Sequence, residues 1–284
     1  MNTLQVYAFA DEASGNVDEQ IKALQRNNLN GLEIRNVDGT NISEISLQKA
    51  AEVKKKLDDA GLKTWSIGSP IGKINIETDD FGKHLETFKH SLELSAVLEA
   101  DCFRLFSFYL PFGKNPSDYR NEVLERMGTF CDLAKGYSVT LCHENEKGIY
   151  GDIPERCLEL HQALPELKGI FDPANYIQCN VDTLQGWKLL KPYIKYMHIK
   201  DALAEGAVVP AGKGVGNVPA IVKDFVAGGG NAFTIEPHLT IFDGFANLEK
   251  GGESAKDRPF VYENSNAAFD AACEAFQSIL TDVR

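Results

Sequence analysis

The chain has 284 residues and a formal net charge of −12, with 43% hydrophobic and 25% charged residues. This length is enough for one large hydrophobic core, and the composition is that of a globular protein, not of a disordered one. An acidic surface repels phosphate backbones and anionic lipids, which argues against nucleic acid and membrane surfaces as partners. A small neutral substrate meets no such repulsion.

The N-terminal sequence MNTLQVYAFADE has neither a basic segment nor a long apolar run, so no signal peptide is expected. No stretch approaches the roughly 18 uninterrupted apolar residues of a membrane span. The six cysteines include no C-x-x-C pair, and a chain with a large core does not need disulfides, so we expect free thiols. These features together predict a cytoplasmic protein.

A short, apolar, β-rich run followed by a longer stretch of helical periodicity recurs along the whole chain. The expected strands are 4–9, 31–35, 62–68, 102–108, 139–144, 168–172, 193–199 and 232–236. The expected helices are 17–27, 46–61, 84–100, 118–136, 153–164, 181–190, 218–229 and 266–280.

Strands that are apolar on both faces, each followed by a helix, indicate a parallel sheet covered by helices. The first strand is followed by FADEASG, which lacks the glycine-rich turn that binds a dinucleotide in doubly wound sheets. Eight strand–helix units without that turn favour a closed barrel. We therefore expect a single-domain (β/α)8 TIM barrel over residues 1–284.

The last four expected strands end in CHENE, FDPAN, MHIKD and IEPH, and each ending contains a residue that can bind a metal ion. These residues are Glu144, Asp172, His198 and Glu236. In TIM barrels the C-terminal strand ends line the active site, and neighbouring strands lie about 4.8 Å apart. One such residue alone would be interpreted as a polar strand end facing solvent, but four in succession predict a shared site.

Three carboxylates in one small space repel one another and raise one another's pKa, and a divalent cation removes this repulsion. Three oxygen donors and one imidazole suit Mn²⁺ or Mg²⁺, with Co²⁺ and Zn²⁺ as alternatives. The sequence thus predicts one divalent ion at the mouth of the barrel.

The HIKD run that begins at His198, the EPH run that begins at Glu236 and the glycine-rich PAGKGVGN stretch resemble motifs of the xylose-isomerase-like TIM-barrel family. The resemblance covers essentially the whole chain. It implies a metal-dependent isomerase or epimerase that acts on a small sugar, ketose or inosose, phosphorylated or not, through an enediolate. It also implies that Glu144 and Glu236 are both metal ligands and the catalytic base and acid.

Other polar residues near the strand ends are candidates for substrate binding, namely Glu33, Lys73, Arg104, Asn175, Lys200 and His238. Arg104 interrupts an apolar strand, so it either points into the mouth or lies outward under a helix. Lys200, like His143, flanks a ligand; because neighbours along a strand point to opposite faces, a position behind the ligands or in a loop is expected for both. Residues 212–216, GKGVG, precede a helix and could bind phosphate through backbone N–H groups, although a tight turn with Lys213 in solvent is the simpler interpretation.

Three other functions remain open at this point. A dehydratase would use the same ion and a similar base but expel a hydroxyl group as water. An endonuclease IV-type hydrolase needs additional histidines, yet the chain has only six, and Asn175 stands where that branch has histidine. A non-catalytic sugar-binding or partner-binding barrel is disfavoured by the complete ligand set.

The chain also departs from two branches of the family that it resembles. The segment IKDALAEGA lacks the arginine that hexulose 3-epimerases carry after the strand-7 histidine. The larger carboxylate cluster of two-metal xylose isomerase is not found either, which disfavours a hydride shift. The expected partner is a small carbohydrate, and the sequence leaves open whether the protein forms a homo-oligomer.

Overall fold

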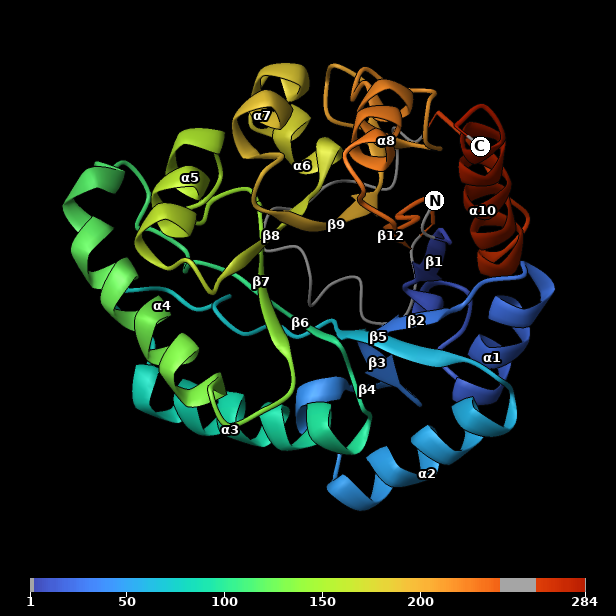
Figure 1. Cartoon of the computed structure of the whole chain (residues 1–284), viewed down its shortest axis with the longest axis horizontal. Helices are drawn as coiled ribbons and strands as arrows, with labels where there is room; N and C mark the ends of the chain where they lie inside the picture. Colours follow the sequence, from blue (N-terminus) through green and yellow to red (C-terminus); the bar gives the residue numbers. More distant parts are fainter. Residues whose placement is uncertain (1–2, 241–258, 284) are drawn as a thin grey trace.

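The structure, a computed structural model, describes residues 3–240 and 259–283, and its strands form a closed parallel barrel (Figure 1). Around the barrel the strand order is β1-β12-β9-β8-β7-β6-β5-β2. The strands are β1 (Gln5–Ala8), β2 (Gly31–Ile34), β5 (Lys63–Ile67), β6 (Cys102–Leu105), β7 (Thr140–Glu144), β8 (Lys168–Phe171), β9 (Ile194–Ile199) and β12 (Ala232–Ile235). The expected TIM barrel and all of its strands are confirmed.

A ring of helices encloses the strands (Figure 1). They are α1 (Val17–Arg26), α2 (Leu47–Asp59), α3 (Phe81–Val97), α4 (Arg120–Ala134), α5 (Pro154–Ala163), α7 (Thr183–Leu190), α8 (Val218–Ala227) and α10 (Ser265–Thr281). Each matches an expected helix. The largest difference is at α3, which begins three residues earlier than expected because the Asp80 carboxylate caps it by accepting the Lys83 N–H.

Short elements in the strand–helix connections escaped the sequence patterns because they are too short to show a period. They are α6 (Pro173–Gln178), the pairs β3 (Asn36–Val37) with β4 (Thr40–Asn41) and β10 (Asp201–Ala202) with β11 (Val208–Val209), and the 3₁₀ turns η1 (Ala10–Glu12), η2 (Ile42–Glu44) and η3 (Pro116–Tyr119). Helix α6 begins at once after β8, because Asp172 caps it and Pro173 occupies its first turn.

Side chains from the strands fill the barrel below its mouth. This inner cluster consists of Tyr7, Trp65, Cys102, Cys142, Ile170, Tyr196 and Ala232. Tyr7 and Trp65 stack with ring centroids 5.0 Å apart. A second, larger core fills the space between the strands and the helices. Packed side chains therefore fill the interior of the barrel, and a binding site has room only at its mouth.

All six cysteines are free, and Cys179 alone among them is not fully buried. None of the helices in the described part of the chain is long and apolar enough to cross a bilayer.

Gly31 lies where β2 passes close to β5. A Cβ atom at this position would lie 1.8 Å from the carbonyl oxygen of Lys63. Any side chain here would force the two strands apart, so we expect Gly31→Ala to lower the free energy of unfolding by about 3 kcal/mol or more. Urea unfolding measures the change.

Gly136→Ala is the matched control, because a Cβ atom there meets nothing within 4 Å. Equal stability of the two variants would contradict the proposed clash at Gly31.

Candidate metal centre

Four side chains from neighbouring strands meet at the mouth of the barrel. Glu144 is the last residue of β7, Asp172 follows β8, His198 lies near the end of β9, and Glu236 follows β12. All four are buried, and one potential ligand atom from each lies within 4.8 Å of the others. The structure thus brings together the residues that the strand endings singled out.

The two nitrogens of His198 face different surroundings. Nδ1 lies 3.0 Å from Glu144 Oε1, 3.4 Å from Glu236 Oε2 and 4.0 Å from Asp172 Oδ2. Nε2 points the other way and lies 3.0 Å from Glu33 Oε2. The carboxylates therefore converge on Nδ1, and Glu33 holds the opposite edge of the ring.

Glu33, an expected substrate-binding residue, does not lie at the mouth of the barrel. Its side chain is fully buried beneath His198, and its Oε1 accepts a hydrogen bond of 3.0 Å from Tyr196 Oη. Tyr196 belongs to the inner cluster, so Glu33 connects that cluster to the centre above it. Its position within β2, one layer below the mouth, keeps it away from the pocket.

Arg104 points inward, which decides between the two orientations that the sequence left open. Its NH1 donates to Glu144 Oε2 at 3.1 Å, and its NH2 donates to the carbonyl oxygen of Gly68 at 3.1 Å. The guanidinium also lies over the rings of Phe9 and Phe106, 4.9 and 5.1 Å from their centroids. These contacts fix Arg104 in one position beside Glu144.

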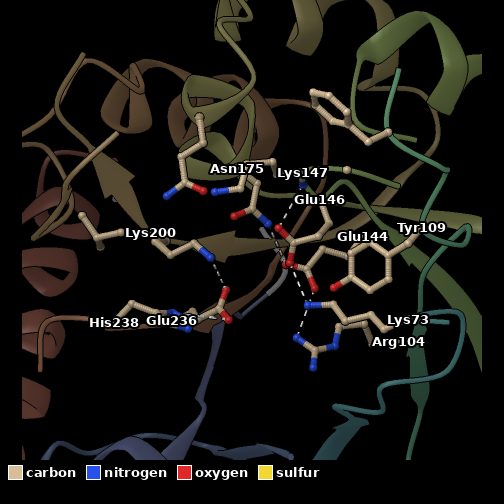
Figure 2. A pocket seen from close by; sticks show the side chains of 14 residues that line it. Lys73, Arg104, Tyr109, Glu144, Glu146, Lys147, Asn175, Lys200, Glu236 and His238 are labelled. Atoms are coloured by element: carbon tan, nitrogen blue, oxygen red, sulfur yellow. Dashed lines mark hydrogen bonds and ion pairs between the residues drawn. The ribbon is translucent and has the colours of Figure 1, made fainter. Parts of the chain in front are cut away.

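Lys200 directly follows β9, and its side chain turns toward the proposed ligands. Its Nζ lies 2.9 Å from Glu236 Oε2 and 3.0 Å from Asp172 Oδ2, and only 7% of its side chain is exposed. Figure 2 shows its side chain pointing toward Glu236. The physical reason is periodicity: Lys200 is two residues after His198 and so shares its face.

His143, in contrast, is adjacent to Glu144 and turns away from the mouth as expected. Its Nε2 lies 2.9 Å from Ser107 Oγ.

Burial raises the pKa of every acid in the centre, and the nearby cations decide the outcome. For Glu144, His198 and Arg104 outweigh burial and lower the pKa to about 2. For Asp172, burial prevails over Lys200 and raises the pKa to about 7. The two carboxyl groups therefore differ widely in proton affinity.

The remaining groups of the centre are held in their charged forms. Burial opposes a charge on His198 and on Lys200, but the surrounding carboxylates outweigh it and hold both pKa values well above their usual ranges. Burial is also outweighed at Glu236, where Lys200 and His238 hold the pKa well below its usual range. The centre is thus a buried network of opposite charges.

The donor set fits a divalent cation. It offers three carboxylates and one imidazole nitrogen, a combination that suits Mn²⁺ or Mg²⁺. In addition, Asp172 Oδ2 is buried and accepts no hydrogen bond within the described residues, since Lys200 Nζ approaches it without hydrogen-bond geometry. A buried carboxylate oxygen in this condition has capacity left for a ligand.

A second group of potential ligands adjoins the centre, and of its additional residues the sequence analysis named only His238. Glu12 and His238 each place a potential ligand atom within 4.8 Å of Glu236. The buried guanidinium of Arg35 lies 2.8 Å from Asp11, 3.1 Å from Glu12 and 3.5 Å from Glu236. The carboxylate cluster is therefore larger than expected, but Arg35 already supplies positive charge to this side of it.

The sequence did contain a signal for this group. FADE follows the first strand and EIR ends the second, so both are polar strand endings of the kind that identified the other residues. Of the residues in these two endings, only Glu33 was predicted as a site residue.

A cavity of about 550 Å³ opens above the centre (Figure 2). Its lining includes five of the expected substrate-binding residues, Lys73, Arg104, Asn175, Lys200 and His238. Residues that carry no sequence pattern complete it, among them Tyr109, Phe112, Glu146 and Lys147 in loops and Gln178 at the end of α6.

Several of the side chains that line this cavity form hydrogen bonds or ion pairs with one another. Asn175 Nδ2 donates to Glu144 Oε1 at 3.3 Å, and Lys73 Nζ pairs with Glu146 at 2.8 Å. The floor of the cavity is therefore formed by the ligand cluster and its polar neighbours.

The glycine-rich segment 212–216 wraps around a carboxylate of the protein itself. The N–H groups of Gly212, Gly214 and Gly216 donate to Asp201 at 3.0, 3.1 and 2.9 Å. Because Asp201 occupies these donors, the segment forms a turn and does not offer them to a phosphate.

Solved structures with similar folds cover nearly the whole chain at low sequence identity. A xylose isomerase-like TIM-barrel protein from Mycobacterium smegmatis, solved in complex with magnesium, is 14% identical with a TM-score of 0.72, and the match covers 100% of both chains. D-psicose 3-epimerase in the presence of D-fructose is 13% identical, with a TM-score of 0.73 and 99% of each chain covered. The probable 3-DHS dehydratase AsbF from Bacillus anthracis is 16% identical, with a TM-score of 0.71, and the match covers 97% of this chain and 99% of AsbF.

At these identities the likeness establishes the fold alone. Among curated proteins, none matches the sequence significantly. Residues 21–257, however, match the family model described as xylose isomerase-like TIM barrel. Together with the closed eight-stranded barrel, this match shows that the chain belongs to the xylose isomerase-like TIM-barrel family.

Proposed function

We propose that the protein is a metal-dependent isomerase or epimerase of a small sugar, ketose or inosose. The observation that carries the proposal is the buried convergence of Glu144, Asp172, His198 and Glu236 at the floor of a cavity. The similarity in fold to D-psicose 3-epimerase agrees with a carbohydrate substrate. The free thiols suit a reducing compartment, so we place the protein in the cytoplasm.

These four residues would hold one divalent ion, with His198 binding through Nδ1. We favour Mn²⁺ or Mg²⁺ because three of the four donors are oxygens, and the M. smegmatis protein of similar fold was solved with magnesium. The bound ion would polarise a substrate carbonyl and acidify the neighbouring C–H bond. Glu33 would accept the Nε2–H of His198 and so fix the ring's tautomer and orientation.

Glu144 and Glu236 are the proposed base and acid. Their low pKa values keep both ionised at neutral pH, so either carboxylate can accept a proton from a substrate carbon. The protonated glutamate, or its partner, then returns a proton. Return to the opposite face of the same carbon is epimerisation, and delivery to the neighbouring carbon is isomerisation. General acid–base catalysis of this kind contributes about 10²–10⁴-fold to the rate.

A dehydratase is the alternative, since the same centre could expel a hydroxyl group from the intermediate. The similarity in fold to the probable 3-DHS dehydratase AsbF supports this alternative. The two reactions differ in their products, because only the dehydratase releases water.

The metal assignment predicts the following effects of substitution. His198→Ala should abolish tight binding of Mn²⁺, because it removes the only nitrogen donor of the four-residue cluster. Glu33→Gln should weaken Mn²⁺ binding about 10–100-fold, because the amide is a poorer acceptor for the imidazole N–H. Isothermal titration calorimetry with Mn²⁺ measures both changes.

Glu155→Gln, a substitution at an exposed site on α5, is the matched control and should bind Mn²⁺ like the wild type. Elemental analysis showing equal metal in the wild type and in a His198→Ala/Asp172→Ala variant would refute the site.

The mechanism predicts that turnover in D₂O places solvent deuterium on a substrate carbon. A panel of ketoses, inososes and their phosphates identifies the substrate, and mass spectrometry locates the deuterium. Glu144→Gln and Glu236→Gln each keep an oxygen donor but remove the proton acceptor, so activity should fall about 10²-fold or more while metal is largely retained. Asp172→Asn should act mainly on metal affinity, because its role is ligation.

Two outcomes of the D₂O experiment would change the proposed reaction. A product without carbon-bound deuterium would indicate a hydride shift and rule out the two-glutamate mechanism. A product that has lost water would establish the dehydratase.

A further inference from the structure

The ammonium group of Lys200 lies among the proposed metal ligands and also faces the cavity (Figure 2). Its Nζ is 2.9 Å from Glu236 Oε2 and 3.0 Å from Asp172 Oδ2. An ammonium carries three N–H donors, and these two carboxylates take at most two of them. At least one donor therefore remains for a molecule bound in the cavity.

Arg104, another cation at the cluster, also has an N–H without a hydrogen-bond partner among the described residues, at Nε, but that atom is buried. Its guanidinium is fixed by Glu144, by the carbonyl oxygen of Gly68, and by two aromatic rings. Lys73 in the cavity wall is likewise paired with Glu146 at 2.8 Å. Lys200 alone among these three cations is held only by side chains that a divalent ion would share.

The proposed reaction supplies an acceptor for this donor. A neutral ketose brings no charge when it binds, but the enediolate formed from it places negative charge on an oxygen within the cavity. A positively charged donor held at the floor of that cavity stabilises such an oxygen.

We propose that Lys200 is a further catalytic residue, whose ammonium donates a hydrogen bond to the enediolate oxygen that develops negative charge on the Asp172–Glu236 side of the centre. The inference rests on the proposed function and adds a third participant to the two glutamates. A donor preorganised toward developing charge acts on the transition state more than on the bound substrate.

This role makes Lys200 different from a residue that merely supports the ligands. A supporting residue strengthens metal binding, so its removal weakens the affinity. A positive charge next to the ligands repels the metal ion, so its removal strengthens the affinity, by about 10-fold for a partly screened pair. Metal affinity and anion affinity should therefore change in opposite directions when Lys200 is neutralised.

The experiment compares Lys200→Met with the wild type and with Lys195→Met, an exposed lysine on the same strand β9. Calorimetry measures the binding of Mn²⁺, and then the binding of glycolohydroxamate, a small anionic mimic of an enediolate, to the Mn²⁺-loaded protein. Lys200→Met should bind Mn²⁺ about 10-fold more tightly. It should bind glycolohydroxamate about 10–100-fold more weakly, because it lacks one charge-assisted hydrogen bond to the anion. Lys195→Met should match the wild type in both.

A second variant and a kinetic measurement complete the test. Lys200→Gln retains N–H donors to the carboxylates but lacks the charge, and it should reproduce the effects of Lys200→Met if that variant folds poorly. With the substrate found in the D₂O assay, kcat should fall about 10²-fold while KM changes less.

Weaker Mn²⁺ binding in both Lys200 variants would overturn the inference and assign the residue to ligand support. Unchanged affinity for glycolohydroxamate would overturn it as well, and would leave the proposed function standing. A wild-type protein that binds no Mn²⁺ would instead overturn the proposed function, and with it the role of Lys200.

Discussion

Carboxylates buried at the mouth of a barrel need positive charge within a few ångströms, and this requirement accounts for most of the contacts around the centre. Arg104 lies beside Glu144, and Lys200 lies between Asp172 and Glu236. Arg104 lies on β6 and Lys200 directly follows β9, so the barrel itself positions both cations. The pairs also separate the pKa values of the carboxyl groups, since the cations lower those of Glu144 and Glu236 while burial raises that of Asp172.

The closed parallel sheet makes this concentration of charge possible. Parallel strands deliver their C-terminal ends to one edge, and closure turns that edge into a ring around a small space. Below the ring, the packed side chains of the inner cluster fill the barrel. Glu33 joins the two layers: Tyr196 of the inner cluster donates to it from below, and His198 contacts it from above. The orientation of the imidazole therefore depends on packing deep in the barrel.

The connections after the strands control what can reach the centre. Asp201 accepts hydrogen bonds from the N–H groups of the glycine-rich segment, which fixes the loop between β11 and α8. Lys73 and Glu146 pair across the cavity wall, and Tyr109 lines it from the connection after β6. Differences in substrate within one fold are expected to arise in such loops, since the strands themselves are committed to the core and the ligands.

The sequence alone predicts the repeating strand–helix units, the closed barrel and the four strand endings that meet at the centre. It could do so because apolar periodicity reports secondary structure, and because every parallel strand ends at the same edge. The tertiary structure decided which way the neighbouring side chains point. Lys200 enters the centre, whereas Glu33 lies beneath it, although both stand near strand ends. Arg35 reaches Glu236 only because closure places β1 between β2 and β12, strands from opposite ends of the chain. Such contacts depend on strand register and barrel closure, which no local pattern of residues encodes.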